Sequence, residues 1–114
     1  MKNHIFIKNK INNFNEKIKV SSDKSISIRS ILLASQSVGI SKISNLLESE
    51  DVLNTLRTIK KLGINYYKKK KIYYIEGYGL NGFNIKKKTI INWGNSGTLA
   101  RLILGLLVKT KKKI

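Results

Sequence analysis

The fold of this chain is decided where the sequence reads Asp23-Lys24-Ser25-Ile26-Ser27-Ile28-Arg29. Upstream, polar and apolar residues alternate over Glu16–Val20, a pattern typical of a half-buried strand. Ser21-Ser22-Asp23 then supplies turn and helix-capping residue types. Downstream, apolar or small residues recur at three- and four-residue steps, which predicts a helix from Ser25 to about Ser37. The residues of this stripe are Ile28, Ile31, Leu32 and Ser35, widened by Leu33 and Ala34.

This strand-to-helix corner is also an arrangement that favours anion binding. The first four N–H groups of a helix have no partner within the helix and carry a partial positive charge, so a phosphate or carboxylate is stabilised there. Lys24 and Arg29 add full positive charges, and Arg29 lies one turn after Ser25, so it can reach back. The hydroxyls of Ser25 and Ser27 can donate to a phosphate, although their simpler role is to cap the helix.

A second corner of the same kind reads Gly94-Asn95-Ser96-Gly97-Thr98, ahead of a predicted helix over Thr98–Lys109 that carries Arg101 in its first turn. Taken alone, this segment is equally consistent with a tight turn in which Asn95 or Ser96 caps the helix. Two such corners in one chain suggest a ligand with two anionic ends.

Between the corners, the chain alternates between helix and strand patterns. Gly39 is expected to end the first helix, and Ile40–Ser44 is a short strand candidate. Ser49 is predicted to cap a second helix, whose apolar stripe ends at Gly63, a residue suited to the left-handed conformation after a helix. The stripe consists of Val52, Leu53, Leu56, Ile59 and Leu62.

The segment that follows has the pattern of a hairpin. Ile64–Tyr67 and Lys71–Glu76 are rich in strand-forming residues and flank a lysine turn, which predicts an exposed tip. A further short strand is expected around Ile85, Ile90 and Ile91. The predicted order is β-α-β-α-β-β-(β)-α, a single α/β or α+β domain for a chain of 114 residues.

The net charge of +17 suggests a polyanion partner, and four tyrosines, Tyr66, Tyr67, Tyr73 and Tyr74, flank the basic hairpin turn where they could stack on bases. Composition offers a simpler explanation. The chain has 20 Lys and 3 Arg beside 18 Ile, 12 Asn and no Pro, which are the preferences of A- and T-rich codons. Arginine, the residue that reads guanine and clamps phosphates bidentately, is scarce. A solvated, compositionally biased surface is therefore favoured, and a small basic polyanion- or RNA-binding module is the alternative.

The composition also argues against metal and membrane chemistry. With no Cys, one His and 6 acidic residues, no metal site is expected. Met1–Lys10 lacks the long apolar core of a secretory signal, and Leu102–Val108 is far shorter than the roughly 20 apolar residues that span a bilayer. We expect a soluble, cytoplasmic protein with no membrane partner.

Three blocks of sequence, in this order, resemble the family of 5-enolpyruvylshikimate-3-phosphate synthase, also called 3-phosphoshikimate 1-carboxyvinyltransferase. A Lys-Ser-x-Ser-x-Arg pattern at Lys24–Arg29, followed at this distance by Gly-Asn-Ser-Gly-Thr at Gly94–Thr98, is specific to that family. The blocks are Ile18–Arg29, Ile43–Val52 and Gly94–Leu102, and the resemblance runs from about Lys17 to Val108.

The resemblance implies a fold and an activity. The fold would be an incomplete part of the enolpyruvyl transferase inside-out barrel, built on its β-α-β-α-β-β folding unit. The activity would be transfer of the enolpyruvyl group from phosphoenolpyruvate to the 5-hydroxyl of shikimate 3-phosphate, with release of phosphate, in the shikimate pathway of aromatic amino-acid biosynthesis. The reaction needs no cofactor, its partners are these two small anions, and the full-length family is expected to be monomeric.

The resemblance also implies roles for single residues. Lys24 would be catalytic, lying between the two substrates, where its charge suits stabilisation of a tetrahedral intermediate. The residues implied for shikimate 3-phosphate are Lys24, Ser25 and Arg29. Those implied for phosphoenolpyruvate are Lys24, Asn95, Gly97 and Thr98, with Gly97 acting through its backbone.

Members of the family are several times longer than this chain and bind their substrates between two domains. The chain would then be an N-terminal fragment, inactive alone. Residues 1–20 would be a strand region that packs with the missing second domain, and residues 21–114 the first part of the N-terminal substrate-binding domain.

Overall fold

The computed structural model describes residues 8, 15, 21–85 and 88–110 of the chain. The predicted strand at 16–20 lies outside the described residues, as does most of the separate N-terminal region predicted over 1–20. The described part contains six elements in the order α1 (Lys24–Gln36), β1 (Val38–Ser44), α2 (Glu50–Lys61), β2 (Asn65–Lys69), β3 (Ile72–Tyr78) and α3 (Gly97–Leu107).

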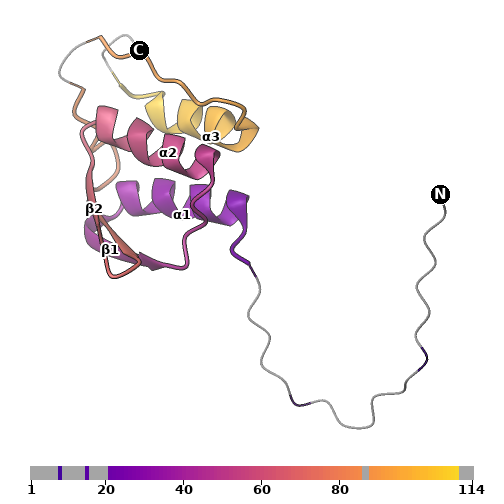
Figure 1. Cartoon of the computed structure of the whole chain (residues 1–114). Coiled ribbons are helices and arrows are strands. Elements are labelled where there is room, and N and C mark those ends of the chain that lie inside the picture. Colours follow the sequence, from indigo (N-terminus) through magenta and orange to yellow (C-terminus); the bar gives the residue numbers. More distant parts are fainter. Residues whose placement is uncertain (1–7, 9–14, 16–20, 86–87, 111–114) are drawn as a thin grey trace, which may run out of the picture.

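The three strands form one antiparallel sheet in the order β1-β3-β2, so that the hairpin strand β3 occupies the centre. At the tip of the hairpin, Lys70 and Lys71 both have positive φ values, of 50° and 63°, as in the two-residue turns that match the twist of paired strands. The predicted hairpin is confirmed, with an exposed lysine tip. The three helices lie together on one side of the sheet (Figure 1).

The core lies between the helices and the sheet. α1 and α2 contribute most of it, and both predicted stripes are confirmed: Ile28, Ile31 and Ser35 of α1 and Val52, Leu56 and Ile59 of α2 are buried. β3 adds Tyr73 and Ile75, and α3 adds Leu99 and Ile103. The prediction was wrong for Leu33, which is 72% exposed and lines an open hollow between α1 and α3.

Side chains and glycines set the helix boundaries. Asp23 caps α1 by accepting a 2.7 Å hydrogen bond from the backbone N–H of Ile26. Gly63, with φ +92°, follows α2 as predicted. The role predicted for Gly39 was wrong. Ser37 closes α1 by donating its N–H and hydroxyl to the carbonyl of Ala34, and Gly39 already lies within β1, paired with Gly77.

The short strand expected around Ile85, Ile90 and Ile91 is not a strand in the described residues of that segment. Ile85 is instead a core residue, 5% exposed, held in place because the N–H of neighbouring Asn84 donates to the carbonyl of Leu62 at 2.9 Å. Across the described residues, every helix is too short or too polar to cross a bilayer.

Candidate functional site

The three helices run in the same direction, and their first turns lie at the same edge of the helix layer (Figure 1). Each first turn contributes backbone N–H groups without intrahelical partners. The partial positive charges of the three helix starts therefore add at one edge of the molecule. Both corners predicted from the sequence lie at this edge, which we call the N-terminal edge.

An ion pair joins the starts of α1 and α2. The Nζ atom of Lys24, at the first position of α1, lies 3.0 Å from Oδ2 of Asp51, in the first turn of α2. The side chain of Lys24 is 49% exposed and that of Asp51 is 17% exposed. The lysine therefore reaches solvent at the N-terminal edge while one side of its ammonium is held by a carboxylate.

A groove joins α1 and α3. A cavity of about 270 Å³ is lined by Arg29 and Leu33 from α1 and by Leu102 and Leu106 from α3, so the two helices run alongside each other in register. One turn back from Arg29 is Ser25, and one turn back from Leu102 is Thr98. The same register therefore places Ser25 and Thr98, one from each corner, about one turn before the groove, on the side of the N-terminal edge.

The second corner also touches α2. Gly94 has φ +55°, and a Cβ atom placed on it would lie 2.9 Å from Nδ2 of Asn54. The other amide atom of Asn54, Oδ1, accepts a 2.7 Å hydrogen bond from Nη1 of Arg57. Because Asp51 and Asn54 lie within one turn of each other, the start of α2 lies between the two corners and contacts both.

At the first corner, the predicted residues differ in their availability. Arg29 is exposed, and Ser25 is half-buried with a hydroxyl that makes no hydrogen bond within the described part of the chain. Ser27 is 4% exposed; its hydroxyl donates to the carbonyl of Asp23 at 2.7 Å and accepts from the N–H of Leu47 at 3.1 Å. The interpretation of Ser27 as a phosphate donor was wrong, because this buried hydroxyl is committed to the backbone.

At the second corner, Ser96 rather than Asn95 is the cap, and its side chain accepts a 3.1 Å hydrogen bond from the N–H of Leu99. Asn95 and Gly97 are exposed, and Thr98 is half-buried. The Nε atom of Arg101 donates to the carbonyl of Gly97 at 3.1 Å, so the guanidinium folds back over this helix start. The glycine leaves its first-turn backbone accessible, as an approaching anion requires.

Chemically, the N-terminal edge can bind a multiply charged anion. It offers the ammonium of Lys24, the guanidinium groups of Arg29 and Arg101, and the free N–H donors of three helix starts. Sequence reasoning missed the parts played by Asp51 and Asn54. An acidic residue in the first turn of a helix is explained by the helix dipole alone, so nothing in the pattern pointed to a partner on another helix.

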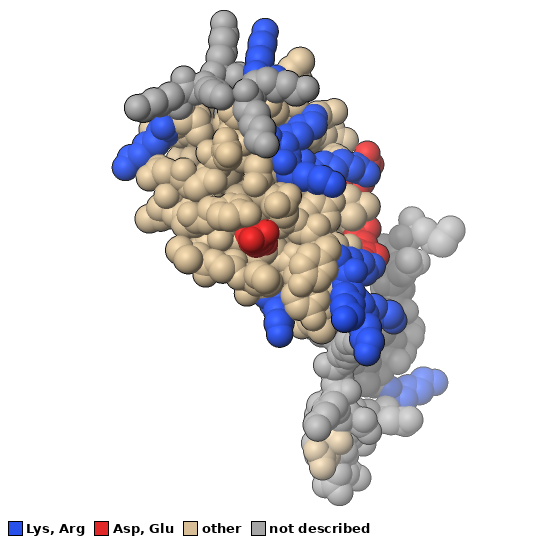
Figure 2. All heavy atoms as spheres, turned by 90° about the vertical axis from the view of Figure 1, so that its left-hand side faces the viewer, with Lys and Arg blue, Asp and Glu red and all other residues tan. Residues whose placement is uncertain are grey.

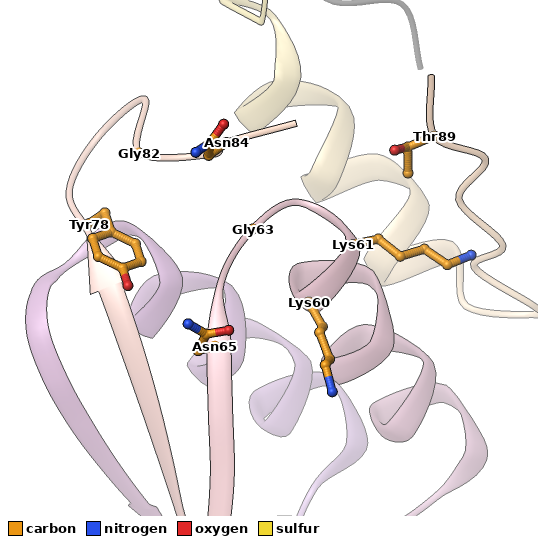
Figure 3. Close-up of a pocket in the computed structure, with 8 residues that line it drawn as sticks. All are labelled: Lys60, Lys61, Gly63, Asn65, Tyr78, Gly82, Asn84 and Thr89. Carbon is orange, nitrogen blue, oxygen red and sulfur yellow. The ribbon is translucent and has the colours of Figure 1, made fainter. Parts of the chain in front are cut away.

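A larger cavity, of about 790 Å³, lies elsewhere (Figure 3). It is bounded by the C-terminal end of α2, with Lys60 and Lys61, and by Asn65 and Tyr78 at the adjoining ends of β2 and β3. In Figure 3 the two lysine side chains extend in different directions, and Nζ of Lys61 donates to the carbonyl of Ile90 at 2.9 Å. This end of α2 carries the negative end of the helix dipole, which disfavours an anion, so the larger cavity is the poorer anion site.

Two tyrosines have raised pKa values. Burial and a 2.7 Å hydrogen bond to Glu48 raise the pKa of Tyr73 to about 12. The pKa of Glu48 is itself lowered, first by its hydrogen bond with Lys68 and then by the one with Tyr73. At the other end of β3, burial and the charge of Glu76 raise the pKa of Tyr78. Neither tyrosine is among the residues that form the two corners.

The chain matches known proteins over nearly its whole length. Residues 8–114 match the family model described as EPSP synthase (3-phosphoshikimate 1-carboxyvinyltransferase). The 3-phosphoshikimate 1-carboxyvinyltransferase of Persephonella marina is 43% identical over 98 residues, which are 86% of this chain and 22% of that protein. The enzyme of the same name from Vesicomyosocius okutanii is 45% identical over 103 residues, 90% of this chain and 23% of its own length.

Solved structures give the same result for the fold. EPSP synthase from Acinetobacter baumannii superposes with a TM-score of 0.70 at 34% sequence identity, over 81% of this chain and 21% of that protein. The α+β architecture and its likeness to this family are thereby confirmed, with only part of the barrel present. The chain spans a little over a fifth of the length of the curated relatives it matches.

Proposed function

The chain belongs to the EPSP synthase family, and we propose that it provides part of the substrate site of a 3-phosphoshikimate 1-carboxyvinyltransferase. The proposed reaction transfers the enolpyruvyl group of phosphoenolpyruvate to the 5-hydroxyl of shikimate 3-phosphate and releases phosphate. The 114 residues alone bind substrate without turnover, since they match only 22% of a relative such as that of Persephonella marina.

One observation carries the proposal: two helix starts with cationic side chains, far apart in sequence, lie at the same N-terminal edge of the helix layer. Both proposed substrates are small molecules with phosphate and carboxylate groups. Such ligands are stabilised by helix N-termini and by charge-assisted hydrogen bonds. A pair of corners suits a pair of anions better than either corner alone.

The proposed roles follow from position. Ser25, on the first turn of α1, and Arg29, one turn later, bind shikimate 3-phosphate. Gly97 and Thr98, on the first turn of α3, bind phosphoenolpyruvate, with Asn95 beside them. Lys24 lies between the two and is the catalytic residue. Its ammonium would stabilise the negative charge that develops on the tetrahedral intermediate, where a fixed charge lowers the barrier most.

The proposal extends to the organisation of the protein. Residues 21–114 form the first part of the substrate-binding domain, and residues 1–20 form a strand region that packs with another part of the protein. We further propose a monomeric, cytoplasmic enzyme that works without a cofactor, because the charges needed at the transition state are supplied by side chains and helix starts.

The surface gives less support to an RNA-binding function. On the sheet side of the molecule, the lysines and arginines gather toward opposite ends of the face, with acidic side chains between and beside them (Figure 2). Tyr67 and Tyr74 stack on each other, with ring centroids 4.8 Å apart, and Nζ of Lys42 lies 5.8 Å from the Tyr74 ring centroid. Stacking surfaces that a nucleic acid would use are thus already partly occupied, and no continuous basic track connects them on this face.

The proposal is tested by titrating the chain with shikimate 3-phosphate and following backbone amide signals by NMR. Signals of residues 24–29 and 95–98 should shift. Lys24→Ala or Arg29→Ala should weaken binding about tenfold or more, the expected loss for a charge-assisted hydrogen bond to a phosphate. Both side chains are exposed, so neither variant should unfold the chain.

The matched control is Lys60→Ala, which removes an exposed lysine from the rim of the larger cavity. Its affinity for shikimate 3-phosphate should stay within about twofold of the parent chain, because distant exposed charges are screened. If Lys60→Ala and Lys24→Ala lost the same affinity for shikimate 3-phosphate, the net charge of the chain, and not the proposed site, would explain the loss. Unchanged spectra at millimolar ligand would contradict the proposed site.

A further inference from the structure

Lys24 occupies an unfavourable position for a cation. It is the first residue of α1, and a positive charge at a helix N-terminus is repelled by the helix dipole. The first turn of α1 contains no acidic residue, and Oδ1 of the capping Asp23 is used by the N–H of Ile26. The carboxylate that pairs with the ammonium comes from another element.

Asp51 supplies that counter-charge from a rigid support. Its Oδ2 atom lies 3.0 Å from Nζ of Lys24, and its side chain is the less exposed of the two. Asp51 lies in the first turn of α2, where a carboxylate is stabilised by the helix dipole. The turn is fixed further by a 2.9 Å hydrogen bond from the hydroxyl of buried Thr55 to the carbonyl of Asp51.

The ion pair adds little to the packing of α1 on α2. Buried apolar side chains, Ile28 and Ile31 on α1 and Val52 and Leu56 on α2, already belong to one core. A half-exposed ion pair contributes little to stability. What the pair does change is the direction of a long, flexible side chain whose free end would otherwise sample many rotamers.

We infer that Asp51 is the positioning residue of Lys24. It holds the ammonium at the N-terminal edge, between the two corners, and accepts one of its three N–H donors, which leaves the others for anionic oxygens of a ligand. This inference rests on the proposed function, because the ligand that benefits is the phosphorylated substrate of that site. Asp51 acts through Lys24 and touches no ligand itself.

The contact is tested without any ligand, by acetylating the lysines with an amine-selective reagent and measuring each site by mass spectrometry. In Asp51→Asn, the labelling rate of Lys24 relative to exposed Lys42 should rise about two- to fivefold, the equivalent of losing a partly exposed ion pair. Glu50→Gln removes the neighbouring carboxylate from the same helix turn and should leave the ratio unchanged. Equal Lys24 labelling in parent chain and Asp51→Asn would overturn the inference.

The positioning role is tested by selectivity between shikimate 3-phosphate and inorganic phosphate. Removing the carboxylate of Asp51 changes the affinity for both anions through its charge. Because this change is similar for the two anions, the ratio of their affinities is largely independent of it. When Asp51 fixes the position of the Lys24 ammonium, the site favours shikimate 3-phosphate over inorganic phosphate. An ammonium that moves freely binds either anion and discriminates less between them. Asp51→Asn should therefore lower the ratio about two- to fivefold, and Glu50→Gln should not.

A double-mutant cycle separates positioning from a general structural effect. In the Lys24→Ala background, Asp51→Asn should not change the ratio, because the side chain through which Asp51 acts is gone. A fall that persists in that background would overturn the inference. If the parent chain binds neither anion at millimolar concentration, the proposed function fails, and the labelling result alone decides whether Asp51 holds Lys24.

Discussion

The two ends of the helix layer carry similar residues and offer opposite chemistry. The N-terminal edge has Lys24, Asn95 and the exposed Gly97, and the other end has Lys60, Asn84 and Gly63 around a cavity of about 790 Å³. At the first, three helices begin, so the positive ends of their dipoles lie together; at the second, α2 ends, with the negative end of its dipole. Helix polarity, more than cavity volume or residue type, decides which end suits an anion.

The ends also differ in how closely the backbone packs. At the C-terminal end of α1, a Cβ atom on Gly77 of β3 would lie 2.3 Å from the carbonyl oxygens of both Ala34 and Ser37. At the N-terminal edge, a Cβ atom on Gly97 would meet only the flexible guanidinium of Arg101, at 3.3 Å. One end fixes the fold by close backbone contact, and the other leaves its backbone open.

The largest effect is expected at the closely packed end. Gly77→Ala forces α1 away from β3 and should destabilise the chain by about 2 kcal/mol or more, because overpacking against rigid backbone cannot be relieved by a side-chain rotation. Chemical denaturation gives the free energy of unfolding.

The matched control is Gly105→Ala on α3, where a Cβ atom meets nothing within 4 Å and φ is not positive. That variant should gain about 0.5–1 kcal/mol from helix propensity. A tolerated Gly77→Ala would contradict the close packing of α1 on β3.

An intermediate effect is expected from the caps at the N-terminal edge. Asp23→Ala removes the side chain that accepts from the N–H of Ile26 and should cost about 1 kcal/mol. Ser49→Ala offers the comparison, because Ser49 holds the same position before α2 without a capping hydrogen bond, and its buried Oγ has no partner within the described residues. The free energy of unfolding of Ser49→Ala should therefore stay within about 0.5 kcal/mol of the parent chain. Equal losses would show that the two helix starts are capped alike.

The smallest effect concerns pH, and it compares tyrosines near the two ends of β3. The pKa of Tyr73 is raised to about 12 in the folded chain, above its value of roughly 10 in an unfolded chain. Its contribution to stability is therefore fully present below about pH 10 and is lost as the pH rises toward 12. Ring-carbon NMR shifts during an alkaline titration measure the pKa of each tyrosine.

Substitution of the partner acids separates the two tyrosines. Glu48→Gln should lower the pKa of Tyr73 and leave that of Tyr78, whereas Glu76→Gln should lower the pKa of Tyr78 and leave that of Tyr73. If either substitution moved both values alike, a general change of charge, rather than these local pairs, would be the cause.

Patterns of local origin predicted most of the fold. The α2 stripe, its following Gly63 and the hairpin with its lysine tip depend on residues within a few positions of one another, and all are confirmed. The boundary at Gly39 was wrong because a serine, Ser37, ended the helix through its own hydrogen bonds. The predictions for Leu33 and for a strand at Ile90 were wrong because apolar residue types in a plausible pattern do not show how closely other elements pack against them.

The candidate site was predictable only in part. The types and spacing of residues at Lys24–Arg29 and Gly94–Thr98 marked the two corners, since capping and anion binding are read from a single helix start. The ion pair between Lys24 and Asp51, and the approach of Gly94 to Asn54, arise from the packing of one helix on another. Packing also removed a candidate. From the sequence, the hydroxyl of Ser27 could donate to a phosphate, but in the structure it is buried and accepts a hydrogen bond from the N–H of Leu47.

The strand order β1-β3-β2 sets a condition on how the chain can fold while it is being synthesised. β1 and β2 make no hydrogen bonds to each other, so among the described strands neither has a sheet partner until Ile72–Tyr78 has left the ribosome. α1 is complete some 42 residues before β3 ends, yet its apolar face has no complete sheet to cover until then. The nascent polypeptide must therefore keep that face shielded or collapsed, and a chaperone that binds apolar segments would act in this interval.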